Sequence, residues 1–139
     1  MEPTITLAEA NRITEANAER MLTALPDGAR LKPFSKYEEV ACDDPDDGGP
    51  AGRKFAERSY QITGLDSTKT AEYHDKLRDW WLDHDFEILR EFPTEGDRLI
   101  SVENSADGFR MSYETNEHGE MYLNSSSPCV WTNGTPEPE

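Results

Sequence analysis

Residues 67–85 of the chain are STKTAEYHDKLRDWWLDHD, and FEIL follows at once at 86–89. In the first segment the apolar and aromatic residues recur mostly at intervals of three and four, which places them on one stripe of an α-helix. These residues are Tyr73, Leu77, Trp80, Trp81 and His84. A helix that turns adjacent indoles to one side must bury them against a broad surface, so the segment predicts a helix packed on a β-sheet.

Four of these residues are predicted core anchors: Tyr73, Leu77, Trp80 and Trp81. Neighbouring positions on an α-helix differ by about 100°, so the two indoles cannot face the sheet equally. Trp80 is in step with Tyr73 and Leu77. We therefore expect Trp80 to be the more deeply buried of the two tryptophans.

Four strands are predicted after this helix, at 86–92, 98–104, 108–115 and 120–126. Short, turn-like connections separate them, so neighbouring strands should pair antiparallel as a meander. Apolar residues alternate with polar ones in each strand, and this predicts one face turned toward the helix. The residues expected on that face are Phe86, Ile88 and Phe92, then Ile100 and Val102, then Phe109, Met111 and Tyr113, and finally Met121 and Leu123.

Upstream, Thr6-Leu7-Ala8-Glu9 has the pattern of a capping box and predicts the start of a first helix. This helix should end at Pro26-Asp27-Gly28, where proline and a turn dipeptide interrupt it. Irregular spacing in 31–42 predicts a loop that leads into a short strand at about 38–42. Alternation in 54–65 predicts a long strand with one polar face.

These segments together predict an α+β fold, with an antiparallel sheet that contains a C-terminal four-strand meander and two helices packed on one face. The 139 residues are long enough for a real core and too short for two ordinary domains. We expect a single domain over residues 1–139, with flexible ends at about 1–5 and 132–139.

The chain is strongly acidic, with 29 Asp and Glu against 14 Lys and Arg and a net charge of −15. Such a field repels phosphate backbones and anionic lipid surfaces, so nucleic acid is not an expected partner. No run of about twenty apolar residues occurs, and no transmembrane segment is expected. The sequence does not fix the oligomeric state, and a monomer is favoured over an oligomer.

The two cysteines, Cys42 and Cys129, lie far apart in the sequence. This spacing fits neither a CxxC redox pair nor a metal site built from neighbouring thiolates. A disulfide that joins two irregular regions is favoured over two buried free thiols. A disulfide would place the protein in an oxidising compartment.

An acidic loop follows Cys42 and contains Asp43, Asp44, Asp46 and Asp47. Aligning the twelve-residue EF-hand pattern at Asp44 places Phe55 at the twelfth position, where the pattern requires a bidentate acid. A solvated turn is therefore favoured over a cation site, and no metal is expected.

The histidines also fail to indicate a reaction. His74 and His84 are ten residues apart and do not share a helical face, and His118 lies in a predicted turn. No nucleophile elbow, zinc-protease, Walker or dinucleotide-binding motif occurs. No catalytic residue and no cofactor are predicted, and an enzyme is less favoured than a binding protein.

Several short motifs resemble the mature domain of a group of small secreted proteins and lipoproteins of actinobacteria. The resemblance covers the chain from about Leu25 to its end. It rests on Cys42-Asp43-Asp44-Pro45, Gly48-Gly49-Pro50, Trp80-Trp81, Val102-Glu103-Asn104, Asp107-Gly108-Phe109-Arg110-Met111, Ser127-Pro128-Cys129-Val130-Trp131 and Gly134-Thr135-Pro136-Glu137-Pro138. It implies export, a bridge between the two cysteines, and a signal or lipid anchor outside the given sequence; it implies no activity. The chain lacks the lipobox cysteine that lipoproteins of this group carry at the start.

Two functions compete. The first is an extracytoplasmic, secreted or lipid-anchored binding or accessory protein that recognises a protein, a peptide or an envelope component on the sheet face away from the helices. The side chains expected on that face are Gln61, Arg110, Ser112, Glu114, Tyr122 and Asn124. The second is an acidic inhibitor or immunity-type protein that occupies a basic site on its partner. A small hydrolase-like enzyme is third.

Overall fold

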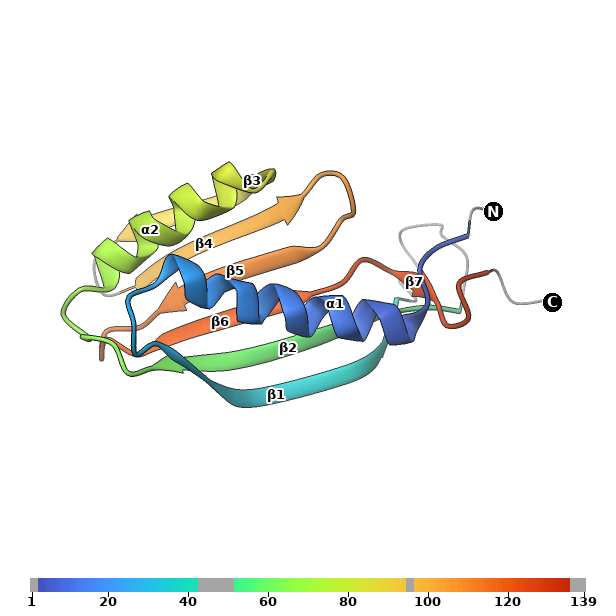
Figure 1. Cartoon of the computed structure of the whole chain (residues 1–139), viewed down its shortest axis with the longest axis horizontal. Helices are drawn as coiled ribbons and strands as arrows, with labels where there is room; N and C mark the ends of the chain where they lie inside the picture. The colour runs from blue at the N-terminus through green and yellow to red at the C-terminus, as the bar shows by residue number, and fades with distance from the viewer. Residues whose placement is uncertain (1–2, 43–51, 95–96, 136–139) are drawn as a thin grey trace.

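A computed structural model describes residues 3–42, 52–94 and 97–135 and shows an α+β fold (Figure 1). Along the chain the elements are α1 (Leu7–Arg20), the 3-10 helix η1 (Met21–Ala24), β1 (Arg30–Ala41), β2 (Arg53–Thr63), α2 (Thr70–Asp83), β3 (Phe86–Thr94), β4 (Asp97–Asn104), β5 (Arg110–Thr115), β6 (Met121–Ser126) and β7 (Val130–Trp131). Both predicted helices are present.

The sheet has seven strands and is larger than the predicted four-strand meander. Its order is β1-β2-β6-β5-β4-β3, with β7 paired to β2, and every pair is antiparallel. The strands β3 to β6 are sequential neighbours. The sheet continues beyond this meander, because β2 pairs with β6 and β1 pairs with β2.

The prediction of a loop and a short strand at 38–42 was wrong, because β1 spans twelve residues, Arg30–Ala41. As an edge strand it is exposed over most of its length, so its sequence shows no clear apolar alternation. Two register shifts, at Pro33/Ser35 and Tyr37/Val40, break the remaining period of two. The sequence pattern was therefore irregular although the backbone is extended.

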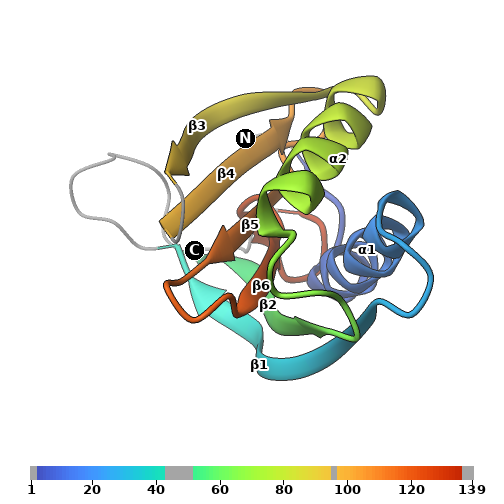
Figure 2. The same cartoon turned by 90° about the vertical axis from the view of Figure 1, so that its left-hand side faces the viewer.

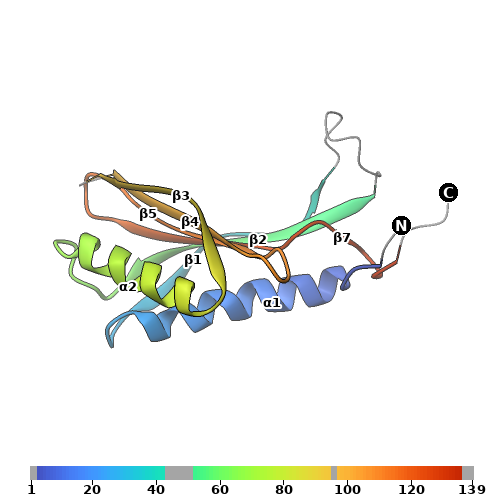
Figure 3. The same cartoon turned by 90° about the horizontal axis from the view of Figure 1, so that it is seen from above.

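Both helices pack on the same face of the sheet (Figure 3). α1 lies against β1, β2 and β6, and α2 lies against β3, β4 and β5 (Figure 2). The predicted capping box begins α1: the Thr6 hydroxyl accepts a hydrogen bond from the Glu9 amide at 3.1 Å, and the Glu9 carboxylate accepts one from the Thr6 amide at 3.1 Å. The two helices leave the opposite face of the sheet without a described helix on it.

The core between α2 and the sheet shows that the expected burial of the two tryptophans was reversed. Trp81 is fully buried, whereas Trp80 is only partly buried, packs at the edge of the core and stacks on His84 with ring centroids 3.8 Å apart. The helix is rotated because a polar residue, His74, is also buried, at 1% exposure. The stripe that includes His74 and Leu77 is centred nearer to Trp81 than to Trp80.

A bulge in β3 changes which of its residues face the helices. The register shifts between Ile88 and Arg90, so that Glu91 lies opposite the buried Ile100. Phe92, which we expected on the inner face with Phe86 and Ile88, is instead 45% exposed on the other side. The extra residue of a bulge inverts the alternation beyond it, and no feature of residues 86–92 predicts this bulge.

The predicted disulfide is confirmed, which excludes two free thiols. Cys42 and Cys129 are bonded with their Cα atoms 6.2 Å apart, across a sequence separation of 87. Beside this bridge the two described chain ends meet: the Thr4 amide donates to the Gly134 carbonyl at 2.8 Å, and the Trp131 amide donates to the Thr4 hydroxyl at 2.9 Å. The bridge joins two regions that we expected to be irregular, and the hydrogen bonds of Thr4 join the two ends that we expected to be flexible.

Replacing the buried indole should cost more than replacing its neighbour. Trp81→Ala removes a side chain of 0% exposure and should lower the free energy of unfolding by about 3–5 kcal/mol. Trp80→Ala removes partial packing, the stack on His84 and a cation–π contact with Arg20, and should cost about 1–2 kcal/mol. Urea melts of both variants measure the difference. Equal losses would contradict the rotation of α2 described above.

Removing the disulfide should destabilise the chain as expected for a long loop. Cys42→Ser combined with Cys129→Ser should lower the free energy of unfolding by about 4–5 kcal/mol, because the unfolded chain regains loop-closure entropy. Denaturant melts in the presence and absence of a reductant measure this. The reductant should destabilise the native protein and leave the double variant unchanged.

Candidate binding face of the sheet

The helix-free side of the sheet, called the open face here, carries every residue that the sequence placed on a binding surface. On β5 and β6 exposed or half-buried positions alternate strictly with buried ones. The open face therefore receives Arg110, Ser112 and Glu114 from β5, and Tyr122 and Asn124 from β6. Gln61 joins them from β2, because it is the register partner of Tyr122.

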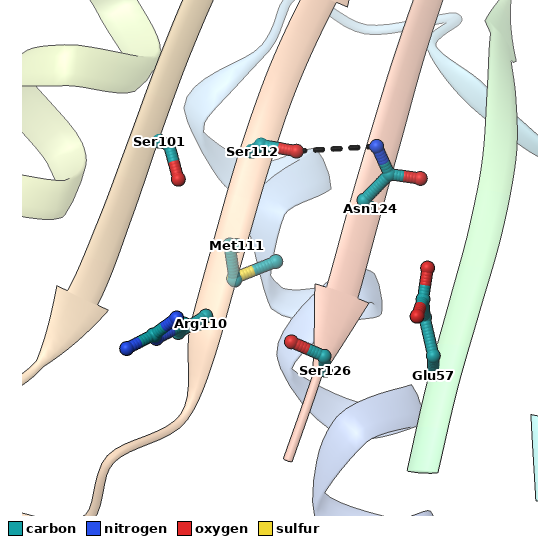
Figure 4. A pocket seen from close by; sticks show the side chains of 7 residues that line it. All are labelled: Glu57, Ser101, Arg110, Met111, Ser112, Asn124 and Ser126. Atoms are coloured by element: carbon teal, nitrogen blue, oxygen red, sulfur yellow. Dashed lines mark hydrogen bonds between the residues drawn. The ribbon is translucent and has the colours of Figure 1, made fainter. Parts of the chain in front are cut away.

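A row of small polar side chains crosses the middle of the open face. Ser59, Asn124, Ser112 and Ser101 are successive register partners on β2, β6, β5 and β4. The Ser59 hydroxyl donates to the Asn124 side-chain oxygen at 2.6 Å, and the Asn124 amide donates to the Ser112 hydroxyl at 3.2 Å (Figure 4). These hydrogen bonds hold the side chains of the row in place. Because these side chains are short, they form a polar floor that lies lower than the longer side chains around it.

The first hollow lies on this floor and has a volume of about 240 Å³ (Figure 4). Glu57 borders it from β2 and Arg110 from β5. The Arg110 guanidinium donates to the Glu103 carboxylate at 2.9 Å, whereas Glu57 makes no ion pair with a described residue. The first hollow therefore combines neutral hydrogen-bonding groups with one uncompensated carboxylate.

The second hollow, of about 360 Å³, adjoins the first at Asn124. It is lined by Phe34, Ser59, Asp97, Glu114, Thr115, Asn116, Tyr122 and Asn124. Phe34 is 72% exposed, and its ring meets that of Tyr122 edge to face with centroids 6.0 Å apart. Desolvation, followed by the charge of Glu120 and its hydrogen bond, raises the pKa of the Tyr122 phenol, which stays neutral at physiological pH.

The predicted binding surface lacked five of the residues that line the second hollow: Phe34, Ser59, Asp97, Thr115 and Asn116. Phe34 was assigned to a loop, because β1 has no regular alternation. Asp97 was placed in a turn, although β4 begins with it. Only the pairing of β1 with β2 and of β4 with β5 brings these residues to the hollow, and such pairing depends on contacts distant in sequence.

The edges of the sheet are less suited to a partner than its open face. β1 is interrupted by two register shifts and contains Pro33, which lacks a backbone donor. β3, at the other edge, contains the bulge after Ile88. Bulges and proline are the devices by which proteins prevent strand addition at sheet edges.

One cluster of ionisable groups lies on the helix side of the sheet. The His74 Nε2 atom is 2.7 Å from a Glu91 carboxylate oxygen, and the Arg78 guanidinium donates to the other oxygen at 3.3 Å. Burial acts to raise the pKa of Glu91, but the hydrogen bonds from His74 and Arg78 outweigh it and lower that pKa. At 1% exposure His74 is closed to a substrate, and the hydrogen bonds of this cluster join α2 to β3.

The described residues contain neither a metal-ligand cluster nor a membrane-spanning helix. Among the described residues, no group of three or more His, Cys, Asp or Glu side chains could hold a metal ion. None of the helices in this part of the chain is long and apolar enough to cross a membrane. The acidic loop with Asp43, Asp44, Asp46 and Asp47 lies outside the described residues.

The sequence matches no family model, and neither a curated protein nor a solved structure is significantly similar to it. The geometry and chemistry of the open face are therefore the basis for a functional conclusion.

Lowering the pH should reduce the free energy of unfolding, in part because Glu91 becomes protonated. A lowered folded-state pKa means that Glu91 contributes stability that is complete above its ordinary value of 4.5 and is lost as the pH falls through the lower folded value. Glu91→Gln should remove this part of the pH dependence. Urea melts between about pH 3 and 7 measure it, with Glu72→Gln, an exposed α2 position, as control. Matching slopes in the native protein and Glu91→Gln would contradict the assignment.

Proposed function

We propose that the protein is a non-enzymatic binding or accessory protein of an extracytoplasmic compartment, secreted or anchored to the cell envelope. It recognises a protein, a peptide or another envelope component through the open face. The observation that carries this proposal is the open face, on which no described helix lies and where two adjoining hollows lie beside exposed aromatic side chains.

The composition of the open face is that of a recognition surface. Phe34 and Tyr37 are 72% and 55% exposed, and Tyr122 and Arg110 lie on the same side of the sheet. Aromatic residues and arginine are enriched in protein interfaces, where they supply contact area and directed hydrogen bonds at little entropic cost. Exposed aromatic side chains that gather on one face mark an interaction site, unlike aromatics scattered singly over a surface, and this supports a binding role.

The bridge between Cys42 and Cys129 supports the compartment part of the proposal. Disulfides persist in oxidising environments and are rare in reducing ones. The resemblance to secreted proteins and lipoproteins of actinobacteria agrees with this location.

The second candidate is an acidic inhibitor or immunity-type protein. The net charge of −15 favours it, because an anionic surface steers a basic partner into contact. Its affinity would depend on many charges and would fall steeply with salt. The hydrolase-like alternative has the least support, since the histidine of the described His74–Glu91 pair is buried.

Truncating one exposed aromatic side chain tests whether the partner binds to the open face or to another part of the surface. We expect Phe34→Ala to weaken binding to a partner captured from an envelope extract by about tenfold, because an exposed aromatic anchor is lost. Leu82→Ala is the matched control: Leu82 is 44% exposed on α2, away from the open face, and its removal should change the affinity by less than about twofold. Surface titration with the purified partner measures both.

The same titration at two salt concentrations separates the two candidates. Binding through the open face combines aromatic contacts with a few charges and should weaken less between about 0.05 and 0.5 M NaCl than binding by an acidic inhibitor, whose many charges act together and which should lose most of its affinity. Equal effects of Phe34→Ala and Leu82→Ala would overturn the proposed function.

A further inference from the structure

We propose that the second hollow binds an arginine side chain presented by a basic segment of the partner protein. This inference rests on the proposed function and names the chemistry of the partner. It is drawn from the aromatic rings, the unpaired carboxylates and the neighbouring first hollow, taken together.

Aromatic and acidic groups meet in the second hollow from four strands. Phe34 on β1 and Tyr122 on β6 supply two rings in edge-to-face contact. Glu114 on β5 is the direct register partner of Tyr122, and Asp97 comes from the start of β4. A cation is attracted both by the face of an aromatic ring and by a carboxylate, so the two kinds of group favour the same ligand.

The carboxylates of this hollow are uncompensated within the described part of the chain. Glu114 and Asp97 make no ion pair with a described residue, and Arg110, the cation that lines the first hollow, is already bonded to Glu103. Lys32 lies two residues from Phe34 on β1 but does not line the hollow. The hollow therefore keeps a negative potential that a cation from outside would neutralise.

Arginine fits this combination better than lysine. Its planar guanidinium stacks on an aromatic face and can donate two parallel hydrogen bonds to one carboxylate, whereas an ammonium is a compact, strongly hydrated point charge. The ring of Tyr122 and the carboxylate of Glu114 stand on paired positions of neighbouring strands, where side chains are in contact range. One guanidinium can use both groups at once.

A protein segment fits better than a free amine, because the two hollows adjoin. Both are lined by Asn124, and the first contains Glu57, a further carboxylate without an ion pair to a described residue. An extended segment on the open face can place one basic residue in each hollow. A single small amine would use only one of them.

The test uses the full chain, labelled with ¹⁵N and titrated by NMR with acetyl-Gly-Arg-Gly-Arg-Gly-amide, its lysine counterpart, and spermidine. The arginine peptide should shift the side-chain amides of Asn116 and Asn124 and should bind about threefold more tightly than the lysine peptide. Spermidine should bind more weakly than the arginine peptide. Spermidine binding that equals or exceeds it would assign the hollow to a free amine and overturn the proposal.

The affinities of single-residue variants show whether the arginine peptide binds in the second hollow. Glu114→Gln and Phe34→Ala should each weaken the arginine peptide by about fivefold. Glu87→Gln is the control, because Glu87 is an exposed carboxylate on β3 outside both hollows and its loss should change the affinity by less than about twofold. Amide spectra of every variant confirm the fold. Equal losses in Glu87→Gln and Glu114→Gln would show general attraction to an acidic protein and overturn the proposal.

Failure here is distinguishable from failure of the proposed function. If Phe34→Ala weakens the captured partner and Glu114→Gln does not, the open face binds that partner without an arginine in the second hollow. If neither variant affects the captured partner, the open face is not its binding site and both proposals fail.

Discussion

A sheet with one apolar side must bury that side, and in this protein the two helices bury it from the same direction. Tyr73, Leu77 and Trp81 of α2 are buried against strands whose inward residues include Ile100 and Tyr113. Because both helices are used for this purpose, the other side of a broad sheet receives no cover from them. The open face is thus a direct result of how the core is closed.

The sequence was sufficient for the parts of the fold that follow local rules. The capping box at Thr6, the helix around Leu77 and the alternation of β4, β5 and β6 all rest on residues within one element. The sequence did not predict the rotation of α2. This rotation goes with the burial of His74, whose partner Glu91 is turned inward by the bulge in β3. The pattern counted His84 in the apolar stripe and left out His74, because periodicity alone does not show which polar side chain has a partner that allows its burial.

The candidate site was predictable to a similar extent. Residues on regularly alternating strands, such as Ser112 and Asn124, were placed on the correct side of the sheet. Phe34 was not, because an exposed edge strand shows no periodicity, and the closeness of Phe34 to Tyr122 depends on pairing between strands distant in sequence. The sequence thus predicted which side chains lie on the open face. The hollows within that face could not be predicted, because they depend on the register between neighbouring strands.

The bridge between Cys42 and Cys129 also has a mechanical consequence. It closes the chain between these residues into a covalent loop, so tension applied through the two chain ends passes from one cysteine to the other and bypasses β2 to β6. The segments outside this loop, which are α1 and β1 before Cys42 and β7 after Cys129, stay in the path of the force. Stretching a molecule held at its two ends would therefore extend α1, β1 and β7 and remove Phe34 from the sheet, while the strands that carry the polar floor around Asn124 bore no load. Load on the chain would thus open one wall of the second hollow while the strands inside the loop stayed paired.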